Sequence, residues 1–146
     1  MLDSASLRRF IYDEILAGGF PPASVRIASH FGVEPKQALN ALAALKIGKT
    51  ALLHADTGEI WMAGPFAAGP TEYSIVSGQK RWWANCAWDM LGVASIVNAP
   101  VRLESACTEC SEPFVMALDP RGDVSEDWVV HFLLPARRWY DDIGFT

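Results

Sequence analysis

The chain has 146 residues, of which 51% are apolar and 20% charged, and its formal net charge is −5. This length suits one ordinary domain or two small parts that share a core, and the apolar content excludes a disordered chain. The acidic excess lies in residues 63–146, with eleven Asp or Glu against six Lys or Arg, so neither half offers the basic surface typical of nucleic-acid binding.

The N-terminal residues lack the features of a secretory signal, and no apolar run approaches the ~20 residues that cross a bilayer. We therefore expect a soluble, cytoplasmic protein with no membrane or nucleic-acid partner, and we leave open a homodimer. The three cysteines are an odd number, so a closed disulfide framework cannot use them all. In a reducing compartment they are core, metal-binding or reactive thiols.

Three helices and a hairpin are predicted in the first part of the chain. Apolar residues at helical spacing predict helices over residues 4–17, 23–30 and 34–46. Two extended pieces, 51–54 and 59–63, flank an Ala-Asp-Thr-Gly turn that favours a hairpin. This order is typical of a winged helix-turn-helix module, assigned to residues 1–63. The third helix offers Lys36, Gln37 and Asn40 but little else that is basic, which favours a structural role over DNA reading.

A second part of mixed α and β structure is predicted over residues 71–146, after a Gly-, Pro- and Ala-rich connector at 63–70. The predicted fold class is therefore α+β, a three-helix module followed by a mixed core. The expected elements are a strand at 72–76, a Trp-rich helix at 79–96, strands at 100–105, 113–118 and 128–134, and a helix or loop at 135–140. Trp82, Trp83 and Trp88 are expected in the core.

Cys86 and Asp89 lie three residues apart in the predicted helix at 79–96, which would place both on one face. A thiolate is a soft ligand for a soft metal, and a nearby carboxyl can relay the proton that the thiol releases. The alternative is that Cys86 is a small buried apolar residue, which is common for cysteine. Spacing alone leaves both interpretations open.

The flanking sequence resembles the organomercurial (alkylmercury) lyase family. The resemblance rests on the run YSIVSGQKRWWANCAWDML from Tyr73 to Leu91, and on VRLESAC, which ends at Cys107. It implies protonolytic cleavage of a carbon–mercury bond: two cysteine thiolates capture mercury, and an aspartate passes a proton to the departing carbon. By this resemblance Cys86 is the first thiol and Asp89 the proton-transfer carboxyl. The implied ligands are a small organomercurial or Hg(II) as substrate and product, with no cofactor.

The sequence departs from the family after Trp139. The family places its second catalytic cysteine after the stretch that here reads WYDDIGFT, and no cysteine follows Trp128. We therefore expect impaired turnover and a native gene that encodes more chain. Either the sequence is cut short, or the next codon is a stop triplet read as selenocysteine, whose selenolate is a softer mercury ligand than a thiolate.

Cys107 and Cys110 form a CxxC turn, for which a structural turn, a metal site and a redox pair remain open. One such pair lacks the second pair that a zinc site needs, so zinc is not expected. The resemblance places Cys107 where the family has a structural cysteine, and Cys110 has no counterpart. His30, His54 and His131 show no ligand spacing, and His131 is expected to be a core or edge residue of an apolar strand.

A second hypothesis, from another class, is a metal- or thiol-responsive regulator that joins a winged helix to a cysteine-bearing sensor part. Such a regulator needs a basic recognition face, and the helix at 34–46 is nearly neutral. The charge pattern therefore favours the lyase, and a gel-shift against genomic fragments separates the two hypotheses.

Overall fold

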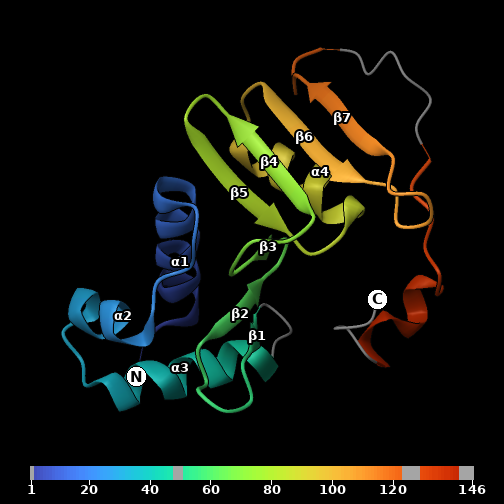
Figure 1. The fold of residues 1–146 in the computed structure, drawn as a ribbon. Helices are drawn as coiled ribbons and strands as arrows, with labels where there is room; N and C mark the ends of the chain where they lie inside the picture. Colours follow the sequence, from blue (N-terminus) through green and yellow to red (C-terminus); the bar gives the residue numbers. More distant parts are fainter. Residues whose placement is uncertain (1, 48–50, 123–128, 142–146) are drawn as a thin grey trace.

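The structure is a computed structural model that describes residues 2–47, 51–122 and 129–141. It has an α+β fold in which three helices lie beside one end of a seven-stranded sheet, while a fourth helix covers one face of its middle strands (Figure 1). All the strand pairs are antiparallel. The predicted fold class is confirmed.

The first three helices agree with the predicted ranges to within one or two residues: α1 (Ser4–Gly18), α2 (Ser24–Phe31) and α3 (Pro35–Ile47). The Asp3 side chain caps α1 by accepting a 2.8 Å hydrogen bond from the Ser6 N–H. Gly19 and Gly32 end α1 and α2 in the left-handed region, with φ of 87° and 64°. Local signals of this kind are readable from sequence because each needs only neighbouring residues.

The sheet has the strand order β1-β2-β3-β5-β4-β6-β7. The predicted hairpin forms between β1 and β2, and the predicted pair at 100–105 and 113–118 forms as β6 and β7. The described chain ends in the short 3₁₀ helix η1. The bounds are β1 (Leu52–Leu53), β2 (Ile60–Ala63), β3 (Phe66–Ala67), β4 (Tyr73–Ser77), β5 (Lys80–Ala84), α4 (Ala87–Val97), β6 (Val101–Ala106), β7 (Pro113–Leu118) and η1 (Ala136–Asp141).

The predicted helix at 79–96 is wrong in its first half, which forms β5, and only the second half forms α4. The five residues of β5 pair with β4 along their whole length, and Trp82 lies opposite Ile75. Burial alternates in β5, with Trp82 and Ala84 buried and Trp83 only half-buried. The aromatic residues therefore follow the two-residue period of a strand, which suits their β preference.

The predicted strand at 128–134 is also wrong where it can be compared, because residues 129–134 contain no strand and Trp128 lies outside the described residues. Val129 is 89% exposed and His131 is exposed as well, so His131 is not a core residue. An apolar run becomes a strand only where a neighbouring strand accepts its backbone hydrogen bonds, and the described residues form no such pairing here.

The predicted connector at 63–70 contains β3, which pairs with both β2 and β5 and so continues the sheet across it. One apolar core includes residues from α1 through β7. The Trp82 Nε1–H donates a 2.9 Å hydrogen bond to the Ile15 carbonyl at the end of α1, and the Lys80 ammonium donates a 3.0 Å bond to the Leu16 carbonyl. The helical part is thus attached directly to the strand that precedes Cys86.

The division into parts at 1–63 and 71–146, and the assignment of the first to the winged-helix class, stay predictions. Among the described residues, no helix combines the length and apolar character that a membrane span requires.

Candidate active site

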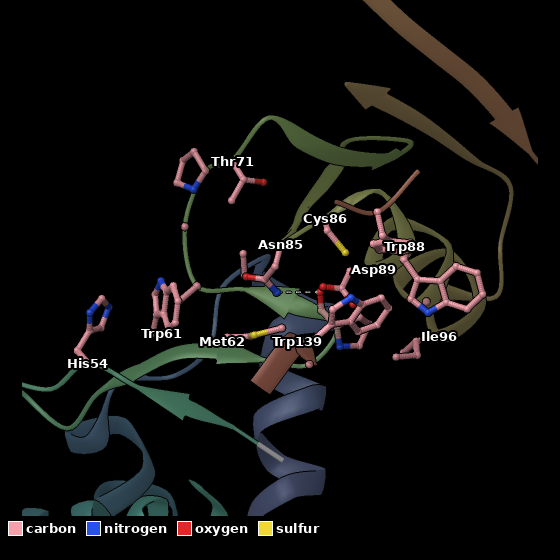
Figure 2. A pocket seen from close by; sticks show the side chains of 18 residues that line it. His54, Trp61, Met62, Thr71, Asn85, Cys86, Trp88, Asp89, Ile96 and Trp139 are labelled. Atoms are coloured by element: carbon pink, nitrogen blue, oxygen red, sulfur yellow. Dashed lines mark hydrogen bonds between the residues drawn. The ribbon is translucent and has the colours of Figure 1, made fainter. Parts of the chain in front are cut away.

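A cavity of about 800 Å³ opens between the β2–β3 turn, the start of α4 and the segment that contains η1 (Figure 2). Both Cys86 and Asp89 line it. The remaining walls are largely apolar and aromatic, and include Trp61, Met62, Pro65, Trp88, Ile96, Phe132 and Trp139. The structure therefore brings together the two residues that the sequence singled out, inside a hollow large enough for a small organic ligand.

Cys86 was predicted to lie within a helix. It is instead the N-cap residue of α4, with extended φ and ψ of −151° and 175°. Asp89 is the third residue of the helix. The cap and third positions lie on the same side of a helix start, so the thiol and the carboxyl lie near each other there. Figure 2 shows the two side chains together at the cavity wall.

The surroundings raise the pKa of both Cys86 and Asp89. Burial raises the pKa of the Cys86 thiol; the backbone N–H groups of Asp89 and Trp88 at the helix start lower it, while the Asp89 carboxylate raises it further. Burial also raises the pKa of Asp89, against hydrogen bonds from the Cys86 thiol and from Asn85 that lower it. The pair therefore retains its protons to higher pH than two separate groups in water would.

Asn85 lies between Cys86 and the β2–β3 turn. Its side-chain Nδ2 donates a 3.4 Å hydrogen bond to the Pro65 carbonyl, drawn as a dashed line in Figure 2, and Asn85 also lowers the pKa of Asp89. The neighbouring Gly64 carbonyl accepts a hydrogen bond from the Tyr12 hydroxyl of α1. Thr71 Oγ1 also donates a 2.6 Å bond to the Ala84 carbonyl, at the end of β5. These contacts hold the chain on both sides of Cys86.

The prediction of a core role for the tryptophans is confirmed for Trp82, which is 3% exposed, and wrong for Trp88, which is 55% exposed and lines the cavity. Trp88 follows Cys86 by two residues at the start of α4, and its side chain lines the cavity. On the other side of the cavity, Trp139 packs against Phe132 with ring centroids 4.6 Å apart and donates a 3.0 Å bond to the Leu134 carbonyl.

The other candidate residues lie elsewhere. Cys107 and Cys110 are exposed in the β6–β7 loop and do not line the cavity. The described residues contain no group of three or more His, Cys, Asp or Glu that could hold a metal ion. His30 stacks on Phe10 with centroids 3.9 Å apart, whereas His54 lines the cavity.

Asn85, Trp61 and His54 line the cavity but were not predicted as site residues. Asn85 is adjacent to Cys86, so its place was visible in the sequence, but its bond to the Pro65 carbonyl was not. Trp61 and His54 belong to the hairpin strands β2 and the end of β1, and only the fold brings that hairpin to the cavity.

Comparison with known proteins identifies a family and a similar solved structure. The model of the alkylmercury lyase family, MerB, matches residues 66–145. A solved structure described as the mercury-bound form of MerB2 superposes with a TM-score of 0.62 and 22% sequence identity, covering 79% of this chain and 55% of that chain. This chain thus spans about half the length of that structure, and the similarity shows a shared fold. A comparison with curated proteins gives no match.

Proposed function

Since the chain belongs to the alkylmercury lyase family, we propose that its cavity cleaves the carbon–mercury bond of an organomercurial by protonolysis. The observation that carries this proposal is that the Cys86 thiol, at the N-cap of α4, and the Asp89 carboxyl, at its third residue, line the same cavity, where burial raises the pKa of both. A soft sulfur and a proton donor beside the same cavity are the two groups that the reaction requires.

The first step is capture. The Asp89 carboxylate takes the proton of the Cys86 thiol, and the resulting thiolate displaces the anionic ligand of an R–Hg–X substrate to form R–Hg–S. The N–H groups of Trp88 and Asp89 at the helix start stabilise the thiolate while it forms.

The second step is cleavage. Protonated Asp89 gives its proton to the carbon bound to mercury, the carbon–mercury bond breaks, and the hydrocarbon R–H leaves. Hg(II) then remains between the Cys86 sulfur and the Asp89 carboxylate, so that charge and protons balance. Burial, which raises the pKa of Asp89, favours the protonated form that this step uses. Asn85 lies in the same cavity wall, where it lowers the pKa of Asp89 and donates to the Pro65 carbonyl.

The aromatic walls receive the organic group. Trp88, Phe132 and Trp139 offer flat apolar surface beside Cys86 and Asp89, and they limit the access of water to the reacting carbon. The thioether of Met62 adds a soft, polarizable surface to the same cavity.

A single-turnover assay tests the proposal. The reduced protein is mixed with phenylmercuric acetate in thiol-free buffer, benzene is measured by gas chromatography, and mercury on the protein is located by mass spectrometry. We expect the adduct on Cys86 and about one benzene per chain. Cys86→Ser should lose the cavity adduct and benzene release, whereas Asp89→Ala should bind the organomercurial without releasing benzene.

The double variant Cys107→Ser/Cys110→Ser is the matched control, since it removes thiols outside the cavity, and it should release benzene as the parent does. Two results would contradict the mechanism. One is an adduct only on Cys107 or Cys110 of the folded parent. The other is an Asp89→Ala protein that releases benzene as fast as the parent.

A further inference from the structure

The loop between β6 and β7 holds two exposed cysteines, Cys107 and Cys110, that the cleavage reaction does not use. The loop is closed by two backbone hydrogen bonds: the Cys107 N–H donates to the Glu112 carbonyl at 2.9 Å, and the Ser111 N–H donates to the Cys107 carbonyl at 2.8 Å. These two bonds fold the chain back on itself, so that Cys110 returns toward Cys107.

Cys107 and Cys110 are the first and fourth residues of this closed turn, and both side chains are exposed. The backbone N–H groups of Cys110 and Glu109, together with the Cys110 thiol, lower the pKa of Cys107. A thiol of this kind ionises readily and is available to a ligand from solution.

We propose that Cys107 and Cys110 form a second mercury site, an exposed dithiol that chelates Hg(II) outside the catalytic cavity. The inference rests on the proposed function only in assuming that the protein meets mercury. The number of ligands favours this ion, because zinc requires about four protein ligands in a structural site, whereas Hg(II) is satisfied by two thiolates. The described residues place no third His, Cys, Asp or Glu ligand with the pair.

Binding is a ligand exchange without redox change. HgCl₂ forms two Hg–S bonds, one to each sulfur; both thiol protons and both chloride ions pass to solvent. The second bond forms within one loop, so the pair should hold mercury against a free monothiol better than either cysteine alone.

The test uses the full chain with Cys86→Ser, which removes the cavity thiol. The reduced and desalted protein is titrated with HgCl₂, challenged with excess 2-mercaptoethanol and weighed by native mass spectrometry. We expect one mercury per chain with the loss of two protons. When either Cys107→Ser or Cys110→Ser is added to this protein, the mercury that it retains against 2-mercaptoethanol should fall at least about tenfold. The variant that lacks all three thiols should retain no mercury.

Three results would overturn the inference: retention in either additional variant equal to that of Cys86→Ser, two mercury ions per CxxC pair, or one mercury bridging two chains. Circular dichroism of each variant checks that the fold is kept. Because Cys86 is absent and no carbon–mercury bond is broken, this titration can succeed or fail independently of the cleavage assay.

Discussion

Gly92→Ala tests whether the close contact between α4 and the β2–β3 turn shapes the cavity. Gly92 lies in the interior of α4 and lines the cavity beside Pro65. A Cβ at this position would lie 3.1 Å from Pro65 Cγ and 3.2 Å from Pro65 Cβ, closer than the 3.4 Å at which ordinary contact begins. One of the two elements must therefore move by a few tenths of an ångström.

Two opposing effects set the change in folding stability of Gly92→Ala. Alanine in place of glycine inside a helix stabilises by about 0.5–1 kcal/mol. The contact with Pro65 opposes this, because overpacking costs about 1–3 kcal/mol. The β2–β3 turn cannot move away from α4 freely, because two hydrogen bonds hold it: Asn85 Nδ2 donates to the Pro65 carbonyl at 3.4 Å, and the Tyr12 hydroxyl donates to the Gly64 carbonyl. We expect the contact to cancel the helix gain or to exceed it.

Gly18→Ala is the matched control, because Gly18 also lies in a helix and a Cβ there meets no atom within 4 Å. Urea denaturation should find Gly92→Ala about 1–3 kcal/mol less stable than Gly18→Ala. Displacement of Pro65 should also move Asn85 and with it Asp89, so benzene release by Gly92→Ala should slow about tenfold or more.

The reasoning is refuted if Gly92→Ala is as stable as Gly18→Ala and releases benzene at the parent's rate. That outcome would mean that Pro65 moves aside without cost and does not position the Asn85–Asp89 pair.

Three further predictions concern single side chains. Burial raises the pKa of Asp89, so folding favours the protonated carboxyl, and the parent loses stability as the pH rises through this raised pKa. Asp89→Asn has no charge to bury, so its stability relative to the parent should increase as the pH rises toward neutral. Urea midpoints of both proteins over this pH range measure the difference. Trp82→Phe should destabilise by about 1–3 kcal/mol, because the Ile15 carbonyl loses its buried partner, whereas Trp61→Phe should change the midpoint little. Trp88→Ala, at an exposed wall, should leave the urea midpoint nearly unchanged but weaken phenylmercury binding in a competition assay.

Local chemistry made the helical part of this protein predictable. The apolar period of α1 to α3 and the glycines that end α1 and α2 depend on residues close in sequence. The β1–β2 hairpin was visible for the same reason, with Gly58 in the left-handed region at φ 71° in the turn. The choice of Cys86 and Asp89 as candidate residues came from the resemblance of the surrounding run to a family, because spacing alone favoured a buried apolar cysteine.

Only the tertiary structure decided which role the aromatic residues play and how the candidate pair meets. Trp82 and Trp88 occupy similar local sequence, yet β4 pairs with β5 and buries Trp82, while the helix start turns Trp88 toward the cavity. A strand requires hydrogen bonds from a distant segment, so a run of Trp and Ala could not reveal where β5 ends and α4 begins. That boundary makes Cys86 a helix cap, and partners far away in sequence, Pro65 and Tyr12 among them, hold the chain around it.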